Sequence, residues 1–278
     1  KPTVKADIPI HADLGELLPV LAQKTYAGPT TEQKAWLEWA RARNVAYPTV
    51  LPEYWDSERI NPYCFVQTLF RQLPEDQITV TANGSACVVG FQAAELAKGQ
   101  RLWTNSGCAS MGYDLPAAIG THQASHKSVV CLAGDGSIMM NLQELQTIAS
   151  AAMPIKIFII NNAGYVSIFQ TQRNFFNGEE VGAGPSSGVT LPNFRKLAAG
   201  FELPYVRIER YEEMEETIRQ VMATEGPIIC EVMVDHNQPF APKLSSRQLP
   251  DGTIVSPDLE DLAPFLPREE LAQNIITD

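Results

Sequence analysis

From about residue 78 onward, short apolar runs alternate with segments in which apolar residues recur at helical spacing. The apolar runs are rich in β-branched residues and predict strands. Because they are nearly continuous rather than alternating with polar residues, these strands are expected to be buried on both faces, as in a parallel sheet. The pattern therefore predicts an α/β domain with an open parallel sheet flanked by helices. The expected strands are 78–81, 101–103, 129–133, 155–160 and 228–234.

The N-terminal segment has a different organisation. A strand is expected over 7–13 and a helix over 14–21. One strand and one helix cannot bury a core by themselves, so residues 1–24 are interpreted as the remnant of a preceding middle domain. The remaining boundaries follow from composition and periodicity: a linker with a helix over 25–62, the α/β domain over 63–244, and a tail rich in proline and acidic residues over 245–278.

Charge and cysteine content narrow the class of protein. The 278 residues carry a formal net charge of −11, which argues against a broad nucleic-acid footprint. No apolar run is long enough to span a bilayer, so no membrane partner is expected. The 5 cysteines are scattered without a CxxC pair, which disfavours a disulfide framework or a zinc site and favours a reducing cytoplasm.

Two loops that follow expected strands carry the candidate chemistry. One is Gly134-Asp135-Gly136-Ser137, and the other contains Asn162, 27 residues beyond Asp135. That spacing is one strand–helix–strand crossover, so the two loops can lie side by side where open α/β sheets bind ligands. A carboxylate and an amide oxygen suit Mg²⁺, and glycine-rich backbone at a helix start suits a phosphate.

Each motif alone is better explained as a tight turn or a helix N-cap. The two together, at crossover spacing, favour a Mg²⁺–diphosphate site.

These residues also resemble a known family. The Gly-Asp-Gly-Ser and Asn161-Asn162 motifs are similar to the GDG…NN signature of thiamine diphosphate (ThDP) enzymes. Within these enzymes, residues 105–120 resemble the GxGxMGxxLPAAIG segment of the acetohydroxyacid (acetolactate) synthase and pyruvate decarboxylase group. The resemblance covers the C-terminal, diphosphate-binding domain of that group, and the tail resembles its C-terminal lid. It implies the ThDP-binding fold of the diphosphate (PP) type.

The resemblance implies roles for individual residues. Asp135, Asn162 and the Gly164 carbonyl would ligate Mg²⁺. Met111 would hold the bent cofactor, and the Ala109 carbonyl would accept a hydrogen bond from its amino group; for Met111, core packing is the alternative explanation. The full set of cofactor-binding residues expected from the resemblance is Ser85, Ala109, Ser110, Met111, Gly134, Gly136, Ser137, Asn162, Gly164, Tyr165 and Val166.

The implied activity is decarboxylation of a 2-oxo acid such as pyruvate, with ligation of the product to a second carbonyl. Three alternatives stay open: a 2-oxo acid decarboxylase without ligation, a C–C hydrolase, and a subunit that holds cofactor without catalysis. The candidate substrate channel is Tyr165, Ile168, Phe169 and Gln172, for which helix packing is an equally good explanation.

The resemblance also implies what other chains or domains must supply. Family members take a glutamate from the pyrimidine-binding domain of a neighbouring subunit, and no segment here resembles that domain. A homodimer or homotetramer is therefore expected, with this chain forming the diphosphate half of a shared site. A flavin (FAD) is possible in family members, but its site would lie mostly in other domains and this chain gives no support for it.

Overall fold

The computed structural model describes residues 5–25, 27–249 and 251–275. The chain divides into two compact units, 1–48 and 49–278. The first contains helices α1 (Leu14–Ala22) and α2 (Thr31–Ala46). Asp13 caps α1 by accepting a hydrogen bond from the Gly15 N–H, and Thr30 forms a capping box with Gln33 at the start of α2. The finer division predicted from the sequence remains a prediction.

The strand expected over 7–13 is wrong, because the structure assigns no strand to these residues. A strand needs a partner to satisfy its backbone groups, and no residue among 5–13 pairs with another described segment in a ladder. Pro9 lies in the middle of the stretch and has no N–H to donate. The helix that follows is confirmed.

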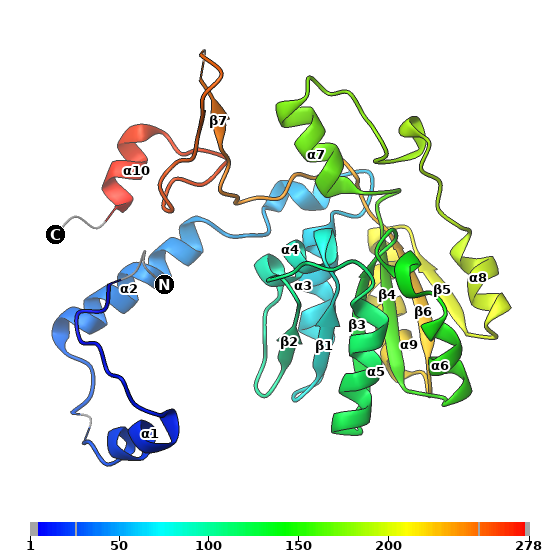
Figure 1. Ribbon diagram of the computed structural model, residues 1–278, viewed down its shortest axis with the longest axis horizontal. Coiled ribbons are helices and arrows are strands. Elements are labelled where there is room, and N and C mark those ends of the chain that lie inside the picture. The colour runs from blue at the N-terminus through cyan, green and yellow to red at the C-terminus, as the bar shows by residue number, and fades with distance from the viewer. Residues whose placement is uncertain (1–4, 26, 250, 276–278) are drawn as a thin grey trace. The chain divides into compact units, whose positions relative to one another are not determined.

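The second unit is built on a six-stranded sheet in which every paired strand is parallel. The strands lie in the order β2-β1-β3-β4-β6-β5, with helices on both faces of the sheet (Figure 1). This confirms the predicted fold class. The strands are β1 (Ile78–Thr81), β2 (Arg101–Trp103), β3 (Val129–Gly134), β4 (Ile155–Asn161), β5 (Tyr205–Ile208) and β6 (Ile228–Met233).

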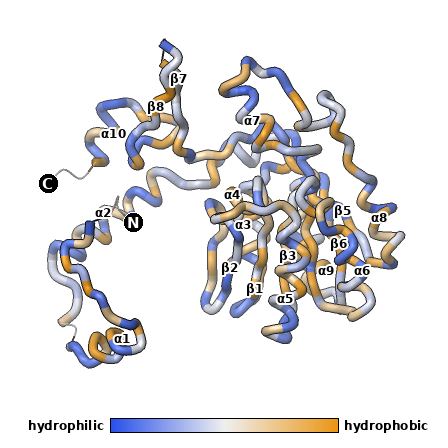
Figure 2. The backbone as a smooth tube through the Cα atoms, in the orientation of Figure 1, coloured by the Kyte–Doolittle hydropathy of each residue, from blue (hydrophilic) through white to orange (hydrophobic). Residues whose placement is uncertain are grey.

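Two separate hydrophobic cores cover the two faces of the sheet. On β3, Val130 and Leu132 belong to one core, whereas Val129, Cys131 and Ala133 belong to the other. Hydrophobic residues run through the central strands for this reason (Figure 2). The first core contains residues of α3 (Pro62–Gln72), α4 (Gly84–Ala93) and α9 (Tyr211–Ala223), and the second contains residues of α5 (Asp114–Ser125), α6 (Glu144–Ser150) and α8 (Phe194–Gly200).

The remaining elements are short. Helix α7 (Val166–Phe175) follows β4, and 3₁₀ helices occupy Pro52–Asp56, Ile138–Asn141 and Pro185–Ser187. Strands β7 (Arg247–Gln248) and β8 (Ile254–Val255) form an antiparallel pair, and α10 (Arg268–Asn274) lies near the end of the chain. Among the helices that the structure describes, none is both long and apolar enough to cross a bilayer.

The path of the chain creates a switch point in the sheet. From β1 the chain passes to β2 at the edge and then returns to the opposite side of β1 to form β3. Loops that leave the carboxyl ends of β1 and β3 therefore diverge and leave a crevice between them, which is the usual ligand site of an open α/β sheet. The polar motifs of the sequence follow β1, β3 and β4.

Candidate cofactor and metal site

A small cavity of about 110 Å³ lies where the loops after β1, β3 and β4 meet. It contains eleven of the residues predicted from the sequence, and Asn83, Gly84 and Ser167 complete its lining. The predicted residues in the lining are Ser85, Met111, Gly134, Asp135, Gly136, Ser137, Asn162, Gly164, Tyr165, Val166 and Ile168.

The Asp135 carboxylate is the buried anion of this cavity. Its Oδ1 accepts a hydrogen bond from the Gly136 N–H at 2.8 Å, and its Oδ2 accepts from the Asn162 and Gly164 N–H groups, each at 3.1 Å. Burial raises the pKa of Asp135 to about 7, and the backbone N–H groups, that of Gly164 first, oppose the rise. A cation against this carboxylate would favour its ionised form.

Asn162 presents an oxygen without a partner. Its side-chain NH₂ donates to Ser85 Oγ at 3.0 Å, whereas its Oδ1 is buried and has no hydrogen-bond partner. Buried polar atoms are nearly always paired, so this amide oxygen, in the same cavity as a buried carboxylate, is available to a hydrogen-bond donor or to a cation. An amide oxygen and a carboxylate are hard donors that fit Mg²⁺, which uses few protein ligands and completes its shell with water and phosphate oxygens. The residues present therefore fit the predicted metal.

Two glycines allow the backbone to approach closely at the cavity. A Cβ added at Gly164, which has φ +144°, would lie 2.3 Å from the Ala183 carbonyl oxygen. A Cβ added at Gly136 would lie 2.4 Å from Cε1 of the Tyr165 ring. Both positions exclude larger residues. Gly136 lets the loop after β3 contact Tyr165 in the loop after β4, and Gly164 lets that second loop contact Ala183 in the segment after α7.

The loop that carries Met111 is held against the loop after β3 by a chain of hydrogen bonds. Ser137 Oγ donates to Asp114 Oδ2 at 2.9 Å and accepts from the Gly112 N–H at 3.0 Å. The Gly112 carbonyl accepts from Asn141 Nδ2 at 2.7 Å. Asp114 is fully buried, and burial raises the pKa of its carboxyl group. Met111 is thus positioned through its neighbour Gly112, whose N–H and carbonyl are held by Ser137 and Asn141.

Replacing Ser137 with alanine is expected to destabilise the fold by about 1–3 kcal/mol, because a buried N–H and a buried carboxylate each lose a partner. The measurement is denaturant unfolding of the intact protein without cofactor. Ser150→Ala is the matched control, because Ser150 is exposed on α6 and accepts only from Gln146. Its effect should stay within about 0.5 kcal/mol. Equal effects of the two substitutions would contradict the structural role of Ser137.

Four predicted residues lie outside the cavity lining. Ala109, at φ +51°, turns its carbonyl toward Asn83, whose Nδ2 donates to it at 3.2 Å. The Ser110 N–H donates to Asn105 Oδ1. Phe169 lines an adjoining cavity with Arg173 and His236. Asn162, Gly164, Tyr165 and Val166 line both cavities. Gln172 binds the backbone of Val181 through both ends of its amide.

The helix expected directly after Ser137 begins later than predicted. A 3₁₀ helix occupies Ile138–Asn141, and α6 starts only at Glu144. The Gly136 N–H, expected to face a diphosphate, donates to its own neighbour Asp135. The loop therefore offers individual N–H groups of a tight turn rather than the aligned N-terminus of an α-helix.

Several residues of the site architecture were not singled out from the sequence. Asp114 and Glu231 are charged residues inside apolar surroundings, and charged residues are rarely buried unless paired. Their position in apolar runs is a signal that sequence reasoning can use.

Comparison with known proteins shows the family of this domain. Residues 82–232 match the model of a family described as thiamine pyrophosphate enzyme, C-terminal TPP binding domain. The chain belongs to this family. The cavity thus lies in a ThDP-binding domain, and the matched segment runs from the end of β1 to β6.

Curated relatives of this TPP-binding domain are named acetolactate synthases. The large subunit from Porphyra purpurea is 31% identical over 249 residues, which is 87% of this chain and 41% of the relative. The mitochondrial enzyme of Schizosaccharomyces pombe is 28% identical over 240 residues, 84% of this chain and 35% of the relative. This chain therefore spans less than half the length of these relatives.

A solved structure shares the fold. It is the Rhodococcus jostii RHA1 thiamine diphosphate-dependent 4-hydroxybenzoylformate decarboxylase, with a TM-score of 0.57 and 23% identity, covering 64% of this chain and 33% of that one.

Proposed function

We propose that this chain forms the metal- and diphosphate-holding half of an active site that decarboxylates a 2-oxo acid, with pyruvate as the first candidate, and ligates the product to a second carbonyl. The observation that carries the proposal is the orphaned Asn162 Oδ1 in the same cavity as the buried Asp135 carboxylate. The names of the acetolactate synthase relatives support the choice of reaction.

The residues of the cavity would hold Mg²⁺ and the diphosphate of ThDP. Asp135, Asn162 Oδ1 and the Gly164 carbonyl would ligate Mg²⁺, and the backbone N–H of Ser137 would face the diphosphate, whereas that of Gly136 donates to Asp135. When bound, ThDP supplies the electron sink that decarboxylation of a 2-oxo acid needs. The chain's own contribution is to bind and orient the group, and the apolar side chains of Met111 and Ile168 line the cavity beside these polar groups.

Because this chain spans less than half the length of the acetolactate synthase relatives, the remaining part of the active site is proposed to come from a pyrimidine-binding domain in the rest of a longer polypeptide, contributed by the neighbouring subunit of a homodimer or homotetramer. The cavity of about 110 Å³ supports this, because pockets that enclose a drug-sized ligand measure about 300–1,000 Å³. This chain alone would therefore enclose only one end of the cofactor. A cytoplasmic location is proposed from the 5 thiols, all of them free.

Product stoichiometry tests the reaction. The intact protein, supplied with ThDP, Mg²⁺ and pyruvate, is expected to release one CO₂ for every two pyruvate molecules consumed and to form acetolactate, as measured by NMR and CO₂ release. A decarboxylase without ligation would release one CO₂ per pyruvate and form acetaldehyde. Cofactor binding without turnover of any 2-oxo acid would favour a subunit that only holds cofactor, and would overturn the proposal.

A further inference from the structure

We propose that Glu231 is a positioning residue for the metal site: through the side chain of Asn161 it fixes the shape of the loop 161–164, which carries two of the proposed Mg²⁺ ligands. This inference rests on the proposed function. Glu231 itself touches neither the cavity nor the groups that would bind there, and it lies on the neighbouring strand β6.

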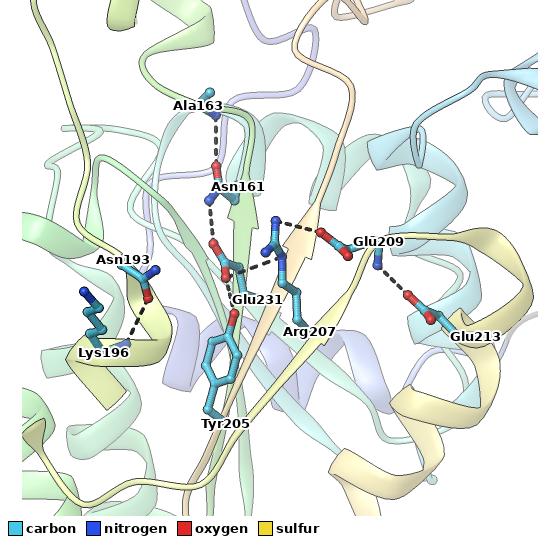
Figure 3. Close-up of polar contacts among 9 residues, drawn as sticks. All are labelled: Asn161, Ala163, Asn193, Lys196, Tyr205, Arg207, Glu209, Glu213 and Glu231. Carbon is cyan, nitrogen blue, oxygen red and sulfur yellow. Dashed lines mark hydrogen bonds and ion pairs between the residues drawn. The ribbon is translucent and has the colours of Figure 1, made fainter. Parts of the chain in front are cut away.

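Glu231 is a buried carboxylate with a partner on each side. It is only 6% exposed, and in the sheet it stands between Ile159 of β4 and Arg207 of β5. Its Oε1 accepts a hydrogen bond from Asn161 Nδ2 at 2.6 Å, and its Oε2 accepts from the Tyr205 hydroxyl (Figure 3). Arg207 Nε lies 3.8 Å from Oε2 and links the group to the sheet edge.

The Tyr205 hydroxyl, which donates to Oε2 of Glu231, stays protonated. Burial, followed by the hydrogen bond with Glu231, raises the pKa of the Tyr205 phenol, so the hydroxyl keeps its proton and donates. The Arg207 guanidinium, which also pairs with Glu209 at 2.8 Å, balances the charge from the half-exposed edge strand. The Glu231 carboxylate is therefore held in one orientation, with Oε1 facing Asn161 as a hydrogen-bond acceptor.

The orientation of Asn161 follows from this. A carboxylate can only accept hydrogen bonds, so the NH₂ end of the Asn161 amide must face Glu231. The Oδ1 end then points to the Ala163 N–H and accepts from it at 3.0 Å. This bond closes an Asx turn around Asn162, and it supports Ala163 at φ +63°, a left-handed conformation that costs free energy in a residue other than glycine.

The Asx turn presents the next residues to the cavity. From it the Asn162 and Gly164 N–H groups donate to Asp135, and the Asn162 side chain reaches Ser85 with its Oδ1 left free. If the Asn161 amide turned over, its NH₂ would face the Ala163 N–H and the turn would lose its bond. The path of influence is thus Glu231, Asn161, the turn at Ala163, and then the metal ligands.

A purely structural role does not account for this glutamate. Burying a charge in a strand is expensive, and an apolar residue of similar size stabilises a core at least as well. Residues two positions apart on a strand share a face, and the residues that share the face of Glu231 on β6, Ile229 and Met233, are apolar. The orientation of the Asn161 amide, which needs an acceptor at this position, explains why a carboxylate is found here.

The test measures Mg²⁺-dependent ThDP binding by calorimetry in the intact protein, without reference to turnover. Glu231→Met is expected to weaken binding about 10–100-fold, the usual effect of losing an outer partner of a metal ligand. Glu231→Gln is expected to bind within about threefold of the native protein, because a glutamine can still turn its oxygen toward Asn161. Tyr205→Phe removes the bond on the far side and should change binding by no more than about threefold.

A double-substitution cycle gives the sharper readout. Asn161→Ala should weaken binding as much as Glu231→Met, and adding Glu231→Met to Asn161→Ala should cause no further loss, because the two act through one path. Hydrogen exchange at the amide of Ala163 should accelerate in both single variants. Independent, additive effects, or losses of affinity that merely follow thermal stability across the five variants, would overturn the inference.

Asp135→Ala, measured in the same series, separates this inference from the proposed function. If Asp135→Ala leaves binding unchanged, the metal site itself is wrong. If Asp135→Ala abolishes binding while Asn161→Ala and Glu231→Met do not weaken it, the metal site stands and only the positioning role fails.

Discussion

Replacing Asp135 with alanine is expected to weaken Mg²⁺-dependent ThDP binding by about 100-fold or more, which exceeds the usual loss for an outer partner of a metal ligand. The substitution removes the one carboxylate of the cavity lining. It also leaves the N–H groups of Gly136, Asn162 and Gly164 without their acceptor. Calorimetric titration of the intact protein with ThDP at fixed Mg²⁺ measures the effect.

Asp135→Asn separates charge from hydrogen bonding. Asparagine keeps one acceptor for the backbone N–H groups but has no negative charge, so it should retain the fold better than alanine and still bind Mg²⁺ poorly. Asp76→Asn is the matched control: Asp76 precedes β1, at the opposite end of that strand from the cavity, and its φ of +60° suits asparagine. Unchanged affinity in both Asp135 variants would refute the metal site.

Replacing Gly164 with alanine is expected to cost about 2–5 kcal/mol of stability and to abolish Mg²⁺-dependent binding. Two effects add: a φ of +144° is strained in any residue but glycine, and the new Cβ would lie 2.3 Å from the Ala183 carbonyl oxygen. The collision is with backbone, and the same Ala183 oxygen accepts from the Tyr165 N–H at 2.7 Å, so relief of the clash breaks that bond. Thermal unfolding and calorimetry check the two parts.

Gly178→Ala is the control for strain without collision. Gly178 also has a positive φ, of +78°, but an added Cβ there would meet nothing within 4 Å. It should cost about 1–2 kcal/mol and leave cofactor binding intact. A Gly164 variant that behaves like the Gly178 variant would show that the close approach at Ala183 has no role in the metal loop.

The central strands could be predicted from the sequence because burial on both faces leaves an unmistakable apolar run. Strand β5 was missed because the charged and partly exposed Arg207 interrupts its four residues, so they form no continuous apolar run. The strand expected over 7–13 failed because an apolar run predicts a strand only where a neighbouring strand can pair with it.

The candidate site was predicted as a set of loop residues, and most of those residues do meet at one cavity. The substrate channel was harder, because successive helical residues point about 100° apart. Ile168 of α7 therefore lines the cofactor cavity while Phe169 faces a different one. The interactions of Glu231 with Asn161, 70 residues away in the chain, could not be foreseen, since they depend on which strands become neighbours.

The position of β3 and β4 in the middle of the sheet has a consequence for how the site opens. Both strands are paired on each side, and nearly all of their side chains are buried. Segments of this kind exchange their amide hydrogens only when the whole domain unfolds. The loops that carry the proposed metal ligands are therefore anchored on strands that open only with the whole domain, and a cofactor that dissociated and bound again would meet a scaffold that had stayed folded.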